Sequence, residues 1–235
     1  FDDLFDFGMG GSRGSMVAPQ AAIKATRDVK NNLKRLASEF NGWDQDLVEY
    51  EAGDLINTRT QEKVHMKELV KRSGEPILGR NFDPEEGLSP VTSFVAQVAE
   101  VEIDPDTGQV KVLKITAAHD VGKILNPVGF HGQVEGGMVQ ALGHAVMEDL
   151  NVDEGGRISN PSLAEYKIPT ERDLPDLETV LVQAPSGWGE YNVKAVGEHS
   201  NITTAPAIAN AIFDAVGERV DTVPVHPEVL YGRLK

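Results

Sequence analysis

The sequence contains no cysteine among its 235 residues. Disulfide bonds, thiolate nucleophiles, cysteine-based zinc sites and iron–sulfur ligation by this chain are therefore excluded. The six histidines do not show the short spacing of a metal-binding pair on a helix (His65, His119, His131, His144, His199 and His226). We therefore expect no metal held by the side chains of this chain alone. A reducing cytoplasm is the default compartment for such a composition.

Positive charge is also in short supply, with 22 Lys and Arg against 37 Asp and Glu and a formal net charge of −15. This balance argues against nucleic-acid binding, because phosphate contacts require clustered Lys and Arg. No apolar run approaches the roughly 20 residues of a membrane span. The start, FDDLFDFGMGGSRGSM, lacks a basic region followed by an apolar stretch, so it predicts no signal peptide. The hydrophobic content of 40% is enough for the core of a globular chain.

The remaining pattern mixes helical and strand periodicity. Alternating residues on both sides of DPDTG predict a long β-hairpin over 93–122, with its turn at 105–108. Before this hairpin we expect a helix over 19–40 that ends at Gly42, a shorter hairpin within 47–57 with Gly53-Asp54 at its turn, and a short helix around 67–71. After it we expect a helix over 131–149 and a strand over 177–183. The last expected helix runs from about Pro206 to Ala215 and stops at Gly217, and the tail is expected to be irregular. With no internal repeat and no linker, we predict one continuous α+β unit over residues 1–235.

The first candidate site is the glycine-rich stretch GMGGSRGSM at 8–16, directly before the first expected helix. Glycines, hydroxyls and free backbone N–H groups at a helix start can bind an anion such as phosphate. The stretch is neither a Walker A motif nor a GxGxxG motif after a strand. The alternative is a glycine-rich loop that ends in a capping serine.

The second candidate is NPVGFHGQVEGG at 126–137, which places Gln133 in the first turn of the expected helix. Its amide can donate to and accept from a heterocycle or a phosphate, or it can simply be solvated. Gly136 and Gly137 each cost a helix roughly 1 kcal/mol relative to Ala. That cost indicates a close approach, either of another backbone or of a ligand.

The third candidate is Glu198, which follows Gly197 in VKAVGEHSNITTAPAIANAI, about eight residues before the expected helix. A carboxylate in this position can act as a general base near a reacting hydroxyl, or it can be an ordinary surface residue. His199 is expected to be exposed or structural. Asp120, in AHDVG, is expected to cap a loop.

Taken together and in this order, five stretches resemble the C-terminal part of the molybdopterin-binding large subunit of the xanthine dehydrogenase family, which includes other molybdenum hydroxylases such as aldehyde oxidoreductases and carbon monoxide dehydrogenases. The stretches are GSRGSMVAPQAA, VAEVEIDPDTGQVKVLKITAAHDVGKILNP, GQVEGGMVQALGHAVMEDL, YKIPTERDLPDLE and VKAVGEHSNITTAPAIANAIFDAVG. The resemblance runs from about Gly8 to Leu230. It implies an α+β molybdopterin-binding domain with mixed sheets and packed helices.

The resemblance also implies roles for individual residues. The serine-rich turn before the helix, here Ser12, Arg13, Gly14 and Ser15, would bind the phosphate end of the cofactor. Gln133, at the start of GQ-x-x-G-G, would contact the pterin near the metal. Gly197 and Glu198 belong to the VGE motif, whose glutamate is the family's catalytic base beside the molybdenum. The chain departs from the family at His199-Ser200, where two prolines are usual.

The same resemblance predicts the reaction and the partners. The reaction is hydroxylation of an electron-poor carbon of a small-molecule substrate, an aldehyde or an N-heterocycle; reduction, hydration or a non-catalytic scaffold are the alternatives. The cofactor is molybdopterin with molybdenum, and its cytosine dinucleotide form is one candidate. Family sequences are longer and carry a further cofactor loop, so we expect this chain to be the second half of a split large subunit. It would be active only with a chain carrying the other half, an iron–sulfur subunit and an FAD subunit.

Overall fold

The computed structural model describes residues 8–80 and 91–235 of the chain. Its contacts divide the chain into two compact units. The small unit comprises residues 17–88, and the large unit comprises residues 1–16 together with residues 89–235. Each unit packs around an apolar core of its own. The single cofactor-binding domain expected over residues 1–235 stays a prediction.

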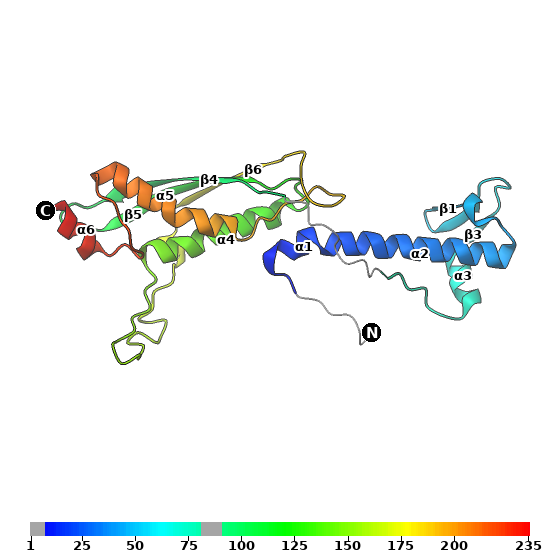
Figure 1. Cartoon of the computed structure of the whole chain (residues 1–235), viewed down its shortest axis with the longest axis horizontal. Coiled ribbons are helices and arrows are strands. Elements are labelled where there is room, and N and C mark those ends of the chain that lie inside the picture. The colour runs from blue at the N-terminus through cyan, green and yellow to red at the C-terminus, as the bar shows by residue number, and fades with distance from the viewer. Residues whose placement is uncertain (1–7, 81–90) are drawn as a thin grey trace. The chain divides into compact units, whose positions relative to one another are not determined.

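The small unit combines a long helix with a small antiparallel sheet of order β1-β2-β3 (Figure 1). Its elements are α2 (Ala18–Asn41), a 3-10 helix (Gln45–Leu47), β1 (Val48–Glu51), β2 (Asp54–Asn57), β3 (Lys63–His65) and α3 (Met66–Ser73). The predicted long helix is confirmed, and Gly42 ends it in the left-handed conformation that glycine favours. The predicted hairpin and short helix are also confirmed, while β3 is an additional strand.

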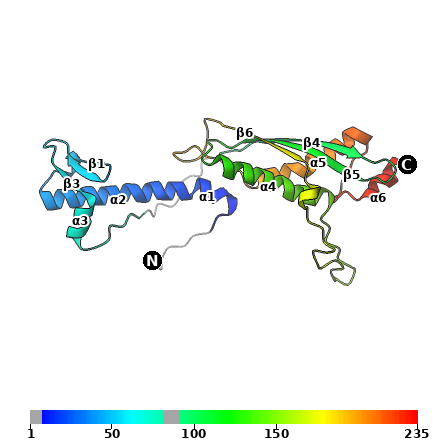
Figure 2. The same ribbon diagram turned by 180° about the vertical axis from the view of Figure 1, so that it is seen from behind.

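The large unit is a three-stranded mixed sheet with two helices on one of its faces, as Figures 1 and 2 show from opposite sides. Its elements are a 3-10 helix (Gly10–Ser12), α1 (Arg13–Met16), β4 (Val95–Ile103), β5 (Val110–Asp120), α4 (Pro127–Val146), a 3-10 helix (Glu171–Asp173), β6 (Asp176–Val182), α5 (His199–Val216) and α6 (Pro227–Leu234). The central strand β5 pairs antiparallel with β4 and parallel with β6. The predicted hairpin, the strand near 177–183 and the α+β class are confirmed.

The core of the large unit lies between the sheet and the two helices. Ile115 on β5 is fully buried, as are Val134 and Met138 on α4 and Ile208 and Ile212 on α5. Removing this apolar surface from water is the main favourable term that holds the two helices on the sheet. The packing fixes the N-terminal halves of α4 and α5 next to each other, where the candidate residues lie.

The prediction that the helix after Asn126-Pro127 covers 131–149 is wrong at its start. α4 begins at Pro127, because the Asn126 side chain accepts a hydrogen bond from the backbone N–H of Gly129 at 3.0 Å and Pro127 suits the first helical position. Gln133 therefore lies in the second turn of α4 rather than in its first turn.

Two predictions near the C-terminus are also wrong. α5 begins at His199 instead of near Pro206, so Pro206 lies inside the helix. Packing in the core offsets the missing backbone donor of this proline. The tail, expected to be irregular, contains α6, which starts at Pro227 and buries Leu230. The stop at Gly217 is confirmed by its left-handed backbone.

Candidate functional site

Three segments that are far apart in the sequence meet at Gly197. The Ser12 hydroxyl oxygen accepts hydrogen bonds from the backbone N–H groups of Val196 and Gly197, at 3.1 and 3.3 Å. A Cβ at Gly197 would lie 3.5 Å from Gln133 Oε1 and 3.8 Å from Ser12 Oγ. The fold thus brings together the glycine-rich stretch, the start of α4 and the VGE motif. Three of the candidate cofactor-binding residues, Ser12, Gln133 and Gly197, lie at one place.

A groove of about 580 Å³ adjoins this junction. It is lined by Gly132, Gln133, Gly136, Val139 and Gln140 of α4, by the buried Gly137, by Glu148, Ile168 and Pro169 after the helix, and by Gly197. A Cβ at Gly132 or Gly136 would meet no atom within 4 Å. The missing side chains leave this side of α4 open, and the polar side chains that α4 places there are the amides of Gln133 and Gln140, while Glu148 adds a carboxylate after the helix.

Glu198 occupies the N-cap position of α5, so the expectation of a helix eight residues later is wrong. Its side chain is exposed and makes no capping hydrogen bond. The positive end of the helix dipole favours a negative charge at this point. The groove lining includes its neighbour Gly197 but not Glu198 itself. The Glu198 carboxylate therefore belongs to the residue next to the groove lining, and neither of its oxygens accepts a capping hydrogen bond from α5.

The other residues of the serine-rich turn lie in or next to α1. The Ser15 hydroxyl donates to the backbone oxygen of Ser12 at 3.2 Å, which closes the turn on itself. Arg13 is half-buried and Gly14 is exposed. Within the described residues, the groove is lined by neither Arg13, Gly14 nor Ser15. Only Ser12 of this turn reaches the junction at Gly197.

Asp120 and Lys194 form a largely buried ion pair that sequence reasoning missed. Lys194 Nζ lies 2.5 Å from Asp120 Oδ2 and donates to the backbone oxygen of Thr92 at 3.0 Å. The other carboxylate oxygen of Asp120 accepts from the backbone N–H of Gly122, so the predicted loop-capping role is confirmed. The pair ties the end of β5 to the segment that leads into Glu198. The available hint was a lysine within the apolar run of VKAV.

Gly137 permits the close contact of α4 with α5. A Cβ there would lie 2.0 Å from Ser200 Oγ, 3.1 Å from Ser200 Cβ and 3.2 Å from the backbone nitrogen of Asn201. Of the two alternatives expected for these glycines, a backbone or a ligand, the approach of another chain segment is found at Gly137. It does not hold for Gly136, which faces open space in the groove.

We expect Gly137→Ala to lower the free energy of unfolding by about 1–3 kcal/mol, as overpacking does in a well-filled core. The Ser200 hydroxyl can rotate away, but its Cβ and the backbone of α5 cannot. Denaturant unfolding measures the change. Gly136→Ala is the matched control, and it should stabilise α4 by up to about 1 kcal/mol because its Cβ meets nothing. Equal stability of the two variants would contradict the close contact.

Two buried histidine nitrogens lie near the start of α5, one on His119 of β5 and one on His199, the first residue of the helix. His119 on β5 is 2% exposed, and within the described residues its Nε2 has no hydrogen-bond partner. Burial lowers the pKa of His119 to about 4, and the nearby His199 contributes in the same direction. His199 Nδ1 is likewise buried without a partner. This agrees with the structural role expected for His199, and His119 is neutral in the folded chain at neutral pH.

The folded state should lose stability as the pH falls from about 6.5 to 4. In that window His119 takes up a proton in the unfolded chain but not in the folded one, because its pKa is lowered from 6.5 to about 4. Unfolding free energies measured at several pH values should therefore rise with pH across the window. His119→Leu, which cannot titrate, should flatten this part of the profile. An unchanged slope in that variant would assign the pH dependence to other groups.

Among residues 8–80 and 91–235, no group of three or more His, Cys, Asp or Glu side chains is placed to hold a metal ion. No helix within the same residues is long and apolar enough to cross a membrane. The junction at Gly197 is made of the Gln133 amide, the Ser12 hydroxyl and backbone groups. These groups suit a polar organic molecule better than a bare metal ion.

A family model described as a molybdopterin cofactor-binding domain matches residues 3–175 of the sequence. The chain belongs to this family. The match covers the serine-rich turn, both strands of the long hairpin and all of α4. It confirms the resemblance drawn from the motifs, while the roles implied for Ser12 and Gln133 stay predictions.

Similar proteins point the same way. The chain is 29% identical to the 6-hydroxypseudooxynicotine dehydrogenase complex subunit gamma of Paenarthrobacter nicotinovorans, over 95% of this chain and 30% of that protein. It is 31% identical to the xanthine dehydrogenase molybdenum-binding subunit of Escherichia coli O157:H7, over 97% of this chain and 31% of that subunit. The chain thus spans about 30% of the length of these relatives. Among solved structures, quinoline 2-oxidoreductase from Pseudomonas putida 86 superposes with a TM-score of 0.79 at 25% identity, over 98% of this chain and 31% of that one.

Proposed function

We propose that this chain forms one wall of the molybdenum-cofactor site of a hydroxylase-type oxidoreductase and supplies its general base, Glu198. The observation that carries the proposal is the meeting of Ser12, Gln133 and Gly197 immediately before Glu198 in a chain of the molybdopterin-binding family. A scaffold would need none of these groups together. The stability of the fold does not require a glutamate at the N-cap of α5 that makes no capping hydrogen bond.

The groove fits a molybdopterin in size and chemistry. It has a volume of about 580 Å³, open space over Gly132 and Gly136, and the amide of Gln133 at its edge. Gln133 would donate to and accept from the pterin, and the serine-rich turn of Ser12, Arg13, Gly14 and Ser15 would bind the phosphate end, with Arg13 adding a charge-assisted contact. When bound, the cofactor would supply the molybdenum redox centre. The cytosine dinucleotide form is the longer candidate.

Glu198 would act on the proton that hydroxylation releases. A general base must be negatively charged and must reach the reacting group, and Glu198 lies at the positive end of α5 with its carboxylate exposed. The ion pair of Asp120 with Lys194 and the bonds from Ser12 hold the 194–197 segment that precedes it. The base is thus positioned by fixed backbone on one side and by a packed helix on the other.

The substrate would be a small molecule with an electron-poor carbon, an aldehyde or an N-heterocycle. Partner chains would complete the enzyme, since this chain spans about 30% of its relatives. One would carry the other half of the cofactor-binding subunit, and others would carry iron–sulfur clusters and FAD, because this chain has no cysteine to ligate a cluster. A cytoplasmic location is part of the same proposal. Reduction or hydration of the substrate at the same site is the alternative chemistry.

The test is the cofactor content of the enzyme purified with all its chains. We expect molybdenum, measured by mass spectrometry of metals, and pterin, measured by fluorescence after oxidation, in equal amounts per copy of this chain. Gln133→Ala should lower both together. A complete complex that contains neither molybdenum nor pterin would leave the scaffold role as the remaining function.

A further inference from the structure

A hydrogen-bonded ribbon, residues 149–160, projects from the large unit between α4 and β6 (Figure 1). Its two sides are joined by an antiparallel bridge between Val152 and Ile158 and by a hydrogen bond from Ser159 to Asn151. Asp153 closes the tip by accepting from the backbone N–H groups of Gly155 and Arg157, at 2.9 Å each. The side chain of Asn160 donates to the backbone oxygen of Asp149 at the base. These hydrogen bonds give the ribbon a defined structure.

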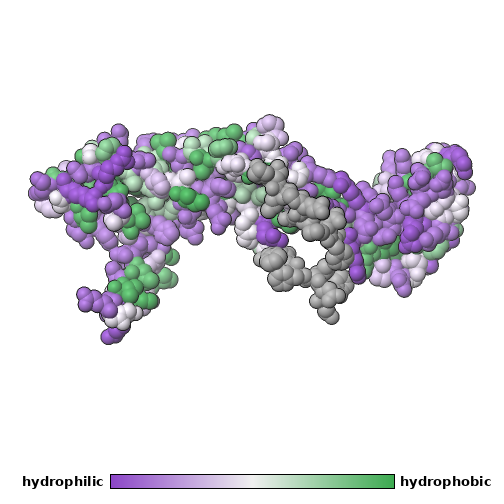
Figure 3. Space-filling model, in the orientation of Figure 1, coloured by the Kyte–Doolittle hydropathy of each residue, from purple (hydrophilic) through white to green (hydrophobic). Residues whose placement is uncertain are grey.

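The ribbon and the segment after it expose large apolar side chains. Leu150 is 53% exposed, Val152 56%, Ile158 48% and Leu163 72%. Figure 3 shows the resulting hydrophobic patch on the projection. A projecting ordered element gains nothing for the folding of its own unit by exposing these side chains to water. An exposed apolar patch on an ordered element is typical of a surface that binds another protein.

The base of the ribbon is continuous with the candidate cofactor groove. Glu148, just before the ribbon, and Ile168 and Pro169, shortly after it, line that groove. The Tyr166 hydroxyl donates to Glu148 Oε2 at 2.6 Å and ties the two flanks together. A polypeptide that covers the groove along α4 would meet the ribbon next.

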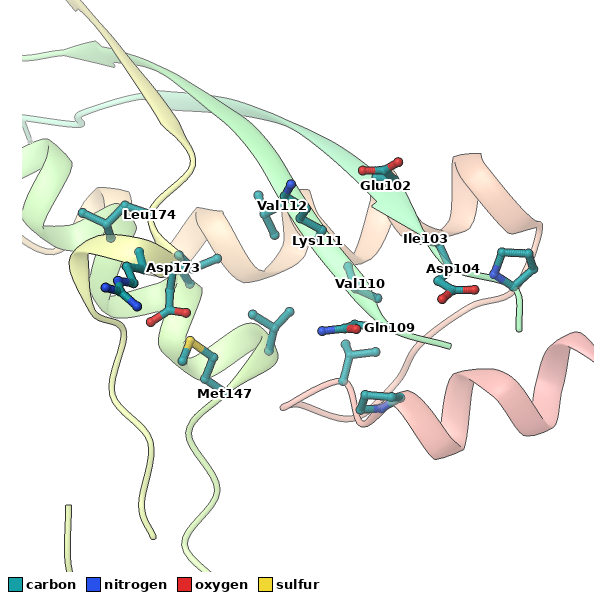
Figure 4. Close-up of a pocket in the computed structure, with 16 residues that line it drawn as sticks. Glu102, Ile103, Asp104, Gln109, Val110, Lys111, Val112, Met147, Asp173 and Leu174 are labelled. Atoms are coloured by element: carbon teal, nitrogen blue, oxygen red, sulfur yellow. The ribbon is translucent and has the colours of Figure 1, made fainter. Parts of the chain in front are cut away.

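A second cavity, of about 780 Å³, lies where the hairpin turn, the end of α4 and the start of α6 meet (Figure 4). Its lining mixes carboxylates such as Glu102 and Asp104 with Lys111 and with apolar side chains such as Val110. Within the described residues no buried, unpartnered polar atom belongs to this lining. The ribbon therefore offers the more definite surface.

We propose that the ribbon is the docking element for the polypeptide that carries the rest of the molybdopterin-binding subunit. This inference rests on the proposed function. The missing length is large, since the chain spans about 30% of its relatives, and the groove is open on the side that such a polypeptide must close. The apolar side chains of Leu150, Val152 and Ile158 would be buried against it, which favours association. The iron–sulfur and FAD chains would contact other surfaces.

The first experiment is hydroxyl-radical footprinting of the complete enzyme. Leu150, Val152, Ile158 and Leu163 should be at least tenfold less oxidised than their exposure in this chain predicts. Val229 on α6, 40% exposed in this chain and outside the ribbon, is the internal reference. Oxidation of the ribbon at the rate of Val229 overturns the proposal. A photo-crosslinker at position 158 should then join the rest of the molybdopterin-binding subunit, and a crosslink to a second copy or to a cluster or flavin chain overturns the choice of occupant.

The second experiment replaces apolar atoms of the ribbon by hydroxyl groups and keeps the β-branching at both positions. Val152→Thr is nearly isosteric, and Ile158→Thr also removes the δ-carbon. Val152→Thr with Ile158→Thr should lower the yield of assembled enzyme at least tenfold, while Val229→Thr should leave it unchanged. Normal assembly of the double variant overturns the proposal. The two proposals fail separately. If the enzyme contains molybdenum but its ribbon is oxidised, the docking proposal is wrong and the proposed function stands. If the ribbon is protected but the complex contains neither molybdenum nor pterin, the proposed function is wrong and the docking proposal stands.

Discussion

The Glu198→Gln enzyme is expected to turn over about 10²–10⁴-fold more slowly than the wild type, the range typical of a lost general base. Glutamine has nearly the shape of glutamate but cannot take up a proton at neutral pH. Glu198 makes no capping hydrogen bond in the structure, so the exchange should leave the start of α5 as it is. The loss should fall on kcat, measured under steady-state conditions with the complete enzyme and a substrate it accepts.

Two controls separate catalysis from assembly for this variant. Molybdenum and pterin content should match the wild type, because the groove lining does not include Glu198. Asp214→Asn, the same change on an exposed carboxylate near the other end of α5, should retain full activity. Wild-type turnover in Glu198→Gln would remove this glutamate from the mechanism and favour the scaffold function.

The start of α5 shows why part of the fold escaped sequence reasoning. The buried stripe of this helix is Ser200, Thr204, Ile208 and Ile212, a spacing of four that is regular throughout. Its first half is polar, so hydrophobic periodicity detects only the second half, and Pro206 then looks like a helix start. Ser200 and Thr204 are buried against Gly137 and against Gln97, whose side chain accepts from the Thr204 hydroxyl at 2.6 Å. The helix is thus extended by tertiary packing that no local pattern reveals.

Sequence reasoning likewise found only part of the candidate site. The motifs identify Ser12, Gln133 and Glu198 because each lies in a distinctive local sequence. That Ser12 binds the backbone at Val196 and Gly197, more than 180 residues away, depends on the fold. Lys194 has no distinctive surroundings beyond its apolar neighbours, so its ion pair with Asp120 was not foreseen. Sequence thus indicated the groups proposed for the chemistry, and the fold added the groups that hold them.

Lys194→Met is expected to lower the free energy of unfolding by about 3–5 kcal/mol, the usual loss when one partner of a buried ion pair is removed. The side chain of Lys194 is 4% exposed and that of Asp120 is 15% exposed, so water cannot replace the lost ammonium group. Methionine fills much of the aliphatic volume, which leaves the uncompensated carboxylate of Asp120 as the main penalty. Because this pair fixes the segment leading to Glu198, turnover should fall as well. Equilibrium unfolding in denaturant measures the change in stability.

A matched surface variant and a rescue variant make the origin of that loss visible. Lys114→Met removes the lysine from an exposed pair with Glu178, and it should hardly alter the unfolding midpoint, since solvent screens such pairs. In the Lys194→Met background, Asp120→Asn removes the unpaired charge while its amide oxygen still accepts from the N–H of Gly122. This double variant should regain at least about half of the lost stability, because the cost of a buried charge is then gone. If the double variant remains as unstable as Lys194→Met alone, the loss comes from packing or from the missing hydrogen bond to Thr92. In that case the charge pair is not what holds the segment before Glu198.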